Sequence, residues 1–494
     1  MSGGATAIGR RQTDSRQRLN ETSVLLKSLW LGSQNDRPQA RHFSRMPIHK
    51  VTPDTQKGAS LRELSELKRM SLLPEPLKIP DFRAFWLARL TTTIAQMAMV
   101  IVIGWQVYDI ARQTMDIHQA AFQLGLIGLV QFVPLFVLTP ISGWTADRLD
   151  RRHVARAVIL LELLCALILL GATWSGMISL PILFGVAALL GIARAFAGPA
   201  LGAMAPNLVP RDILPNAIAL SSTAWQTGAI VGPALGGILY DVTPHFPYAL
   251  SAVLFAFAAA CLFTIRPLPR TAIKPGSPLK QMADGLAYVR RNRLVLGAIT
   301  LDLFAVLLGG ATAMLPLYAR DILHVGAEGL GPLRAAPAAG ATLTAIFFSF
   351  RPIKTDVGVK MLTAVVVFGA ATAVFGISKS YFLSLAMLAL LGAADMFSVY
   401  IRQSLIQLHT PDEMRGRVAA ASTLAISASN ELGETRSGFT AALLGPVTAT
   451  VAGGIAAVAV TLIWALWFPE LRRARTFALA QEPPPEEAVI AGGA

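Results

Sequence analysis

Several acidic side chains lie within long apolar runs of this sequence, where an isolated charge is costly. A carboxyl group in such a place can bind a proton, because a poor dielectric disfavours its charged form. We rank Glu434 and Asp302 first as proton-binding candidates, followed by Glu431 and Asp395. Glu162 is also acidic and lies in an apolar run. These residues predict proton chemistry inside a membrane.

The spacing of two of these residues strengthens that prediction. Glu431 and Glu434 are three residues apart, so on a helix they share one face. Two carboxylates this close in a poor dielectric would not both ionise, and one of them would hold a proton. An alternative for Glu434 and Asp395 is a structural ion pair with another helix, with Arg334 and Arg402 as partners. The sequence leaves both interpretations open.

Polar side chains elsewhere in the apolar runs could line a binding cavity. The candidates are Gln96, Gln106, Gln131, Gln226, Arg194, Arg334 and Arg402. Glutamine and arginine in hydrocarbon must find polar partners or water, so they predict a polar centre within an apolar bundle.

Enzyme chemistry has no comparable set of residues. The sequence has no G-x-x-x-x-G-K-[ST] phosphate loop, no H-E-x-x-H and no G-x-S-x-G elbow. Its two cysteines, Cys165 and Cys261, both lie in apolar runs, which excludes a disulfide framework and a Cys-type zinc site. We therefore expect a protein that is not an enzyme, with no catalytic residue, no cofactor and no bound metal.

The elements that must position these side chains are membrane helices. Of the 494 residues, 54% are hydrophobic and 15% are charged, and the mean hydropathy is +0.54. Twelve apolar stretches follow one another between residues 81 and 468, or eleven if 360–408 is divided wrongly. A helix needs about 20 residues to cross about 30 Å of hydrocarbon. The fold class is therefore an all-α polytopic membrane protein with twelve transmembrane helices.

Charge gives the expected orientation. The net charge of +14 is interrupted by apolar runs, which fits anionic lipid head groups better than nucleic acid. If the N-terminus is cytosolic, the outer links carry only Arg112, Arg320 and Lys379, whereas the inner segments carry twenty Lys or Arg residues. Positive residues favour the inner side. We expect both termini to be cytosolic.

The chain divides into five parts. The boundaries are a basic, largely disordered cytosolic tail at 1–80, a six-helix half at 81–265, a cytosolic link at 266–293, a second six-helix half at 294–468 and a cytosolic tail at 469–494. A weak repeat at an offset of 201 residues supports the two halves. It places Pro210 on Pro411, Gly232 on Gly433 and Gly237 on Gly438. Within the first tail, residues 61–70 could form an amphipathic helix on the membrane or one packed on the protein.

A compact charged sequence follows the second apolar stretch. Its residues are Gly143, Asp147, Arg148, Asp150, Arg151 and Arg152. Glycine permits close helix approach, and the charges can form switchable ion pairs. A plain positive-inside anchor would explain the arginines but neither the glycine nor the aspartates. We expect this link to gate a conformational change.

The stretch at 216–240 carries closely spaced glycines. It reads Gly228-Ala-Ile-Val-Gly232-Pro233-Ala-Leu-Gly236-Gly237. Glycines four residues apart make a smooth face for another backbone, and Pro233 removes a helical hydrogen bond, so that the helix can kink. Generic small-residue packing is the alternative.

These two motifs resemble the major facilitator superfamily. The charged link is similar to its G-x-x-x-D-R-x-G-R-R signature, with Asp150 in place of the second glycine, as in bacterial exporters of the enterobactin-exporter group. The glycine pattern matches the helix-5 antiporter signature at every fixed position. The resemblance covers residues 81–468 and implies two rocking halves. Residues 1–80 have no counterpart in a typical member, so a start at Met46 or Met70 stays open.

The resemblance implies a proton-coupled exporter of small amphipathic compounds, drug-like or siderophore-like, in a bacterial inner membrane. It also links an arginine at the position of Arg194 with proton transfer. We expect a monomer whose partners are the substrate, protons and anionic lipids. A facilitator or importer on the same fold remains an alternative, as does a membrane assembly or lipid-handling protein that transports nothing.

Overall fold

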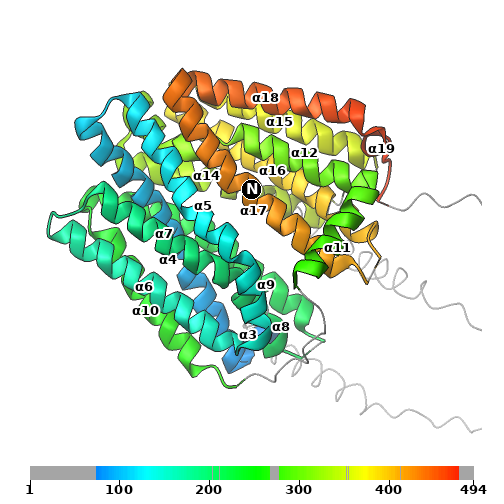
Figure 1. The fold of residues 1–494 in the computed structure, drawn as a ribbon, viewed down its shortest axis with the longest axis horizontal. Coiled ribbons are helices and arrows are strands. Elements are labelled where there is room, and N and C mark those ends of the chain that lie inside the picture. The colour runs from blue at the N-terminus through cyan, green and yellow to red at the C-terminus, as the bar shows by residue number, and fades with distance from the viewer. Residues whose placement is uncertain are drawn as a thin grey trace, which may run out of the picture. The chain divides into compact units, whose positions relative to one another are not determined.

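The computed structural model describes residues 74–202, 204–210, 212–267, 278–351, 353, 355–411 and 413–477 (Figure 1). These residues form helices and short links, and none of them is in a β-strand. The helix considered at 61–70, most of the first tail and most of the last tail lie outside this part of the chain.

The N-terminal half contains one helix for each expected span. Its elements are α3 (Glu75–Lys78), α4 (Pro80–Thr114), α5 (Ile117–Arg148), α6 (Arg151–Trp174), α7 (Leu180–Gly202), α8 (Ala205–Leu208), α9 (Leu214–Val242) and α10 (Phe246–Thr264). Capping fixes the start of α5, where the Asp116 side chain accepts a hydrogen bond from the Gln119 amide at 2.7 Å.

The C-terminal half follows in the same order. Its elements are α11 (Pro278–Arg291), α12 (Arg293–Gly309), η1 (Thr312–Met314), α13 (Leu315–Leu317), η2 (Tyr318–Ile322), α14 (Gly326–Phe350), α15 (Val357–Ile377), α16 (Tyr381–Leu408), α17 (Arg415–Leu444), α18 (Pro446–Trp467) and α19 (Pro469–Arg473). The helix α11 lies within the link expected at 266–293.

Ten helical segments among the described residues are long and apolar enough to cross a membrane. Two more helices, α9 and α17, have 29 and 30 residues and pack among them. This arrangement is consistent with the twelve expected spans. The helix α17 is the less apolar of the two because it carries Glu431, Glu434 and Arg436 within its length. The helix α17 therefore carries two of the four proton-binding candidates, whereas Asp302 and Asp395 lie in α12 and α16, which are among the ten apolar segments.

The two halves repeat one packing pattern. In the N-terminal half α4 packs on α9 and α10, α5 packs on α7, and α6 packs on α7 and α10. In the C-terminal half α12 packs on α17 and α18, α14 packs on α16, and α15 packs on α16 and α18. Each helix therefore has a counterpart in the other half.

The halves meet through two equivalent helix pairs, α5 with α17 and α9 with α14 (Figure 1). A Cβ atom added at Gly125 of α5 would lie 3.0 Å from the Cα atom of Gly438 in α17. A Cβ atom added at Gly331 of α14 would lie 2.8 Å from the carbonyl oxygen of Pro233 in α9. Backbones of the two halves thus touch where side chains would hold them apart.

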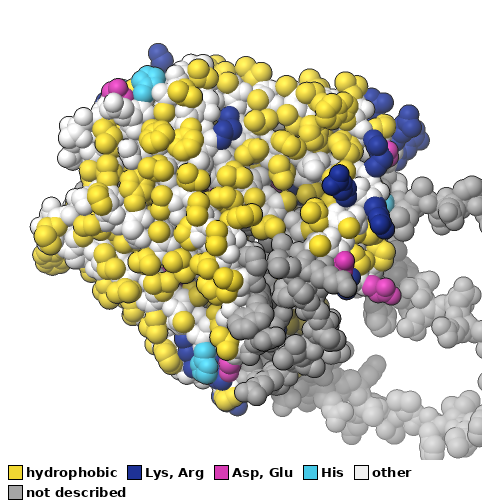
Figure 2. Space-filling view, viewed as in Figure 1, with side chains coloured by type: hydrophobic (Ala, Val, Ile, Leu, Met, Phe, Trp, Pro, Cys, Tyr) yellow, Lys and Arg dark blue, Asp and Glu magenta, His cyan; other side chains and the backbone are white. Residues whose placement is uncertain are grey.

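The surface agrees with a membrane protein. Hydrophobic side chains cover most of the face drawn in Figure 2, and Lys and Arg side chains gather at the edge near α11 and α19. The exposed arginines there include Arg290, Arg291, Arg293, Arg472 and Arg473. We call this side of the protein the α11 end, and the opposite side, where α4 passes into α5, the α4–α5 end.

Candidate functional site

An ion pair joins the two halves near the middle of the bundle. The Nη2 atom of Arg194, in α7, lies 2.6 Å from the Oε1 atom of Glu431, in α17. The Glu431 side chain is 8% exposed, whereas the Arg194 side chain is 43% exposed. Arg194 also donates to the Oε1 atom of Gln131, in α5, at 3.3 Å. Arg194 therefore connects Glu431, a predicted proton-binding residue, with Gln131, a predicted cavity residue.

A second ion pair lies beside the first. The Nη2 atom of Arg334, in α14, lies 3.6 Å from the Oε1 atom of Glu434. The hydroxyl of Thr312 donates to the same oxygen at 3.4 Å. Glu431 and Glu434 share one face of α17, as their spacing predicts, and they are close enough to repel one another. The ion pair suggested for Glu434 and Arg334 is present.

Glu162 is not among the four proton-binding candidates that the sequence predicts, but the structure brings it to the same group. Glu162, in α6, is 1% exposed, and its Oε1 atom accepts a hydrogen bond from Gln96 of α4. Its Oε2 atom is buried without a hydrogen-bond partner among the described residues. Arg194 lies close enough to interact with Glu162 electrostatically. In the sequence, only the apolar run around Glu162 indicated that its carboxyl group belongs to a buried polar site.

We call Glu162, Arg194, Arg334, Glu431 and Glu434 the interface cluster. Its three carboxylates and two guanidinium groups leave one negative charge when every member is ionised. Unbalanced charge is costly where water is scarce, and one bound proton would remove it. The cluster can therefore take up a proton and, at the same time, weaken a contact between the halves.

Two further proton-binding candidates lie elsewhere. Asp302 of α12 forms an ion pair with Arg402 of α16, and the two residues are 5% and 2% exposed. Asp395, also in α16, lines a small cavity together with Asp302. The arginine suggested as a partner of Asp395 thus pairs with Asp302. All three residues lie within the C-terminal half and not at its contact with the N-terminal half.

Two predicted cavity residues lie apart from the interface cluster. Gln106 is 3% exposed and accepts a hydrogen bond from the Tyr248 hydroxyl at 2.7 Å, inside the N-terminal half. Gln226 of α9 donates to the hydroxyl of Thr342 in α14 at 3.4 Å, which is a contact between the halves.

The charged link between α5 and α6 is partly described. For Gly143, Asp147 and Arg148 only the backbone, at the end of α5, is described. Asp150 caps α6 and pairs with Arg152 at 2.6 Å, and this guanidinium holds the pKa of the Asp150 carboxyl below its usual value. Arg152 also donates to the Ile265 carbonyl at 3.0 Å. The link is thereby tied to the end of α10.

The glycine face of α9 packs against α4. A Cβ atom at Gly232 would lie 2.7 Å from the Ile94 carbonyl oxygen, and one at Gly228 would lie 2.6 Å from the Thr93 Cβ atom. A Cβ atom at Gly236 would lie 3.0 Å from the carbonyl oxygen of Ala98, also in α4.

The fourth glycine of this signature faces the other half of the protein. A Cβ atom at Gly237 would lie 2.6 Å from the Ala327 carbonyl oxygen in α14. The expected close approach is present, and the glycine face connects α4 with the contact between the halves.

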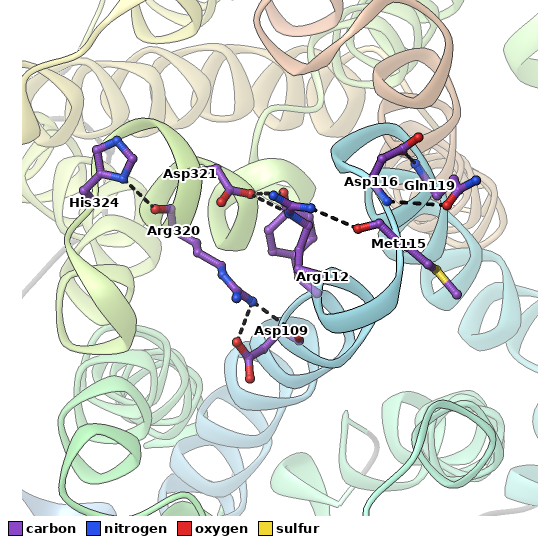
Figure 3. A network of polar contacts seen from close by, with 9 residues as sticks. Asp109, Arg112, Met115, Asp116, Gln119, Arg320, Asp321 and His324 are labelled. Atoms are coloured by element: carbon purple, nitrogen blue, oxygen red, sulfur yellow. Dashed lines mark hydrogen bonds and ion pairs between the residues drawn. The ribbon is translucent and has the colours of Figure 1, made fainter.

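A second set of ion pairs joins the halves at the α4–α5 end (Figure 3). Asp109 of α4 accepts from Arg320 of η2 at 2.5 Å, and Arg112 of α4 lies 3.2 Å from Asp321 of η2. Tyr108 also donates to Asp321. We call Asp109, Arg112, Arg320 and Asp321 the end network.

In the sequence, the two arginines of the end network are predicted only to be charges of the outer links. Each of the two segments carries an acid and an arginine close together in sequence, Asp109 with Arg112 and Arg320 with Asp321. This pattern was the feature of the sequence that could have indicated the network. The acceptor and donor positions lie more than 200 residues apart in the chain, so a local pattern could not join them. The π-helical turn of η2 carries both C-terminal members, and such turns often occur at functional sites.

Comparison with known sequences identifies the family. A profile of the family described as transmembrane secretion effector matches residues 73–490. The enterobactin exporter EntS of Citrobacter koseri is 28% identical over 413 residues, which cover 82% of this chain and 94% of that protein. EntS of Shigella boydii is 26% identical over 410 residues, with the same coverage.

Comparison with solved structures supports the fold. A bacterial homologue of the human lysosomal transporter Spinster, in an inward-facing and unoccupied conformation, has a TM-score of 0.61 at 15% identity and covers 81% of this chain and 97% of its own. A D-xylose–proton symporter has a TM-score of 0.60 at 14% identity and covers 78% of this chain and 98% of its own. The fold and the relatives point to transport and not to catalysis.

Proposed function

Because the chain belongs to the transmembrane secretion effector family of the major facilitator superfamily, we propose that it exports a small amphipathic compound in exchange for protons. The first candidate for the compound is a siderophore of the enterobactin type, since relatives aligned over 82% of the chain are named as enterobactin exporters. A drug-like compound is the second. The membrane would be a bacterial inner membrane.

The observation that carries this proposal is the uneven charge of the interface cluster. Proton binding at Glu431 would neutralise the partner of Arg194 and so remove an attraction between α7 and α17. Loss of the proton would restore it. Proton binding would therefore favour one arrangement of the halves over the other. Coupling of proton movement to the conformational change requires this difference.

The proposed cycle alternates access between the two ends. With both termini in the cytosol, the end network would lie on the outer side, and its ion pairs would close that side in the arrangement described above. Opening there would break the Asp109–Arg320 and Arg112–Asp321 contacts. Protonation from outside would release the substrate, and deprotonation inside would restore the binding form.

The basic side chains of the α11 end would contact anionic lipids from the cytosolic side. The link between α5 and α6 would stabilise one arrangement of the halves without touching substrate, as the tie from Arg152 to α10 suggests. We propose that one chain is sufficient for transport, because each half supplies members of the interface cluster.

Transport by the purified chain in proteoliposomes tests the proposal. Vesicles would be loaded with a pH-sensitive dye and exposed to enterobactin and to a panel of amphipathic drugs under an imposed pH gradient. We expect at least one compound to move against its gradient and to drive protons in the opposite direction. Glu431→Gln and Glu434→Gln should uncouple the two movements.

The matched control is Glu470→Gln, which makes the same change in an exposed ion pair with Arg293. It should leave coupling unchanged. Compound movement that ignores the pH gradient in the unaltered protein would favour the facilitator alternative. No movement of any compound would favour the alternative of a protein that does not transport.

A further inference from the structure

A small cavity lies inside the C-terminal half, apart from the interface cluster. Asp302 of α12, Phe368 of α15, and Asp395 and Ser398 of α16 are among its lining residues. Its free volume of about 10 Å³ is close to the smallest that holds one water molecule. Polar lining and this size together fit a single bound water.

Some buried polar atoms in and near the cavity wall lack hydrogen-bond partners among the described residues. The Ser398 side chain is 2% exposed, and its hydroxyl has no hydrogen-bond partner among the described residues. The Nε atom of Arg402 is buried without a partner in the same part of the chain. Buried polar groups that lack protein partners commonly bind ordered water. The serine hydroxyl therefore marks a place for a ligand in the cavity wall.

The charges facing the cavity do not balance. Asp302 and Asp395 are acidic, and Arg402, which pairs with Asp302, is the basic group on α16. The helix α15 contributes Val365 and Phe368 and no ionisable group to the lining. The helix α14 also packs on α16, but its Arg334 pairs with Glu434. The helix α17 packs on α12, and its Arg436 donates to the Leu308 carbonyl oxygen. The helix α18, which also packs on α12, carries no ionisable residue. Asp302 has a cationic partner, whereas Asp395 has no ion-pair partner among the described residues, so one bound proton would make the three groups neutral together.

The repeat relates this cavity to the interface cluster. An offset of 206 residues takes Gly125 to Gly331, and it takes the α6 cap Asp150 to the α15 cap Asp356. The same offset takes Gln96 to Asp302 and Glu162 to Phe368.

In the fourth helix of each half the offset is 201, which takes Arg194 to Asp395. The lining of the cavity therefore corresponds in position to Gln96, Glu162 and Arg194. Glu162 and Arg194 are the N-terminal members of the interface cluster, and Gln96 donates to Glu162. The two halves thus carry polar groups at equivalent places but with different charges.

We propose that Asp302, Asp395 and Ser398, with one water molecule, form a second proton-binding site inside the C-terminal half. Asp302 stays ionised beside Arg402, and the proton resides on Asp395, which has no ion pair with the described residues. The proton comes from a hydronium ion of bulk solvent through the bound water. At each transfer one O–H bond breaks on the donor, and the last transfer forms one O–H bond on the Asp395 carboxylate. The role of this site in transport rests on the proposed function, but its proton binding does not.

Infrared difference spectroscopy of the purified full-length chain, between acidic and alkaline buffer, tests this site. A protonated carboxyl group gives a carbonyl stretching band that the carboxylate lacks. We expect one such band to disappear in Asp395→Asn and to remain in Glu434→Gln. Asp241→Asn, at the exposed end of α9, is the matched control and should retain the band that Asp395→Asn removes.

Ser398→Ala provides a milder change that leaves the charges in place. It should shift the frequency of the Asp395 band without removing it, because the carboxyl group and the water lose a hydrogen-bonding neighbour. Exchange into D2O should shift the same band if water reaches the site. A spectrum that Asp395→Asn and Ser398→Ala both leave unchanged overturns the proposal.

The spectra separate this site from the proposed function. If the band depends on Asp395 but no compound drives protons in proteoliposomes, the second site stands and the exporter proposal fails. If coupled export is present and the band depends only on Glu431 or Glu434, the exporter proposal stands and the second site fails.

Discussion

Two sets of ion pairs join the halves of this protein, and their charges differ. The end network has two acidic and two basic members, so it is neutral with every group ionised. The interface cluster has three acidic and two basic members, and two of its acids lie on one face of α17. A balanced set holds two surfaces together across a range of pH, whereas an unbalanced set changes when it binds a proton. In the proposed cycle, the end network would therefore close one side of the protein, and the interface cluster would respond to the proton.

Replacement of Arg194, which interacts with both Glu431 and Glu162, should have the largest effect on stability. Arg194→Gln leaves Glu431 buried without its ion-pair partner. Breaking a fully buried pair costs about 3–5 kcal/mol, and the partial exposure of Arg194 places the expected cost near the lower limit, at about 3 kcal/mol. Thermal unfolding of the solubilised protein measures it.

The double variant Arg194→Gln with Glu431→Gln separates stability from coupling. It removes both charges, so most of the lost stability should return while proton coupling stays absent. A double variant as unstable as Arg194→Gln alone would show that charge imbalance is not the cause.

Bulk added where the two backbones touch should have the next largest effect. Gly438→Val places a side chain against Gly125 and should wedge α5 from α17, at a cost of about 1–3 kcal/mol. Transport should fall sharply because the end network can no longer close. Gly171→Val, on α6 where a Cβ atom meets nothing within 4 Å, is the control. Equal losses of transport in both variants would refute the wedge.

A change in the end network should have a smaller effect of a different kind. Asp109→Asn removes one partly exposed partner of Arg320, and such pairs contribute up to about 1 kcal/mol each. We expect a change of a few fold in transport rate with the ratio of protons to substrate unchanged. The charge reversal Asp109→Arg with Arg320→Asp should restore the rate. A changed ratio in Asp109→Asn would remove the distinction between the two sets.

The smallest expected effect is at Asp150, outside the contact between the halves. Its folded-state pKa is lowered by Arg152, so its stabilisation is present above the unfolded pKa of about 3.9 and is lost as pH falls through the folded pKa. Asp150→Asn keeps a side chain that can cap α6 but loses the ion pair with Arg152, so it should cost only about 0.5 kcal/mol at pH 7. The difference in melting temperature from the unaltered protein should shrink in strongly acidic buffer. A difference that grows on acidification would contradict this assignment.

Much of the fold follows from the sequence because apolar runs of membrane length admit few structures. The glycines of α9 were recognisable for a similar reason, since a residue without a side chain has few uses inside a helix except close approach. The ion-pair partners of the charged residues could not be recognised in this way. Arg402 was expected beside Asp395 or Glu434 and pairs with Asp302 instead, because partner choice depends on how α12 and α16 rotate against one another.

Contacts between distant segments explain the other omissions. Glu162 gains its importance from Gln96 and Arg194, which lie on other helices. The end network joins α4 to η2 in the opposite half, and no periodicity within either segment indicates it. Local patterns therefore predict which side chains are costly to bury, and tertiary packing decides which of them form ion pairs with one another.

The number of protons released when substrate binds tests the central claim most directly. Calorimetric titration of the compound exported in proteoliposomes, repeated in buffers of different ionisation enthalpy, gives this number for the solubilised protein. We predict about one proton released per substrate near neutral pH. In Glu431→Gln we predict a release close to zero together with weaker binding, because the neutral side chain resembles the protonated form. Equal proton release in the unaltered protein and in the Glu431→Gln and Glu434→Gln variants would contradict the account.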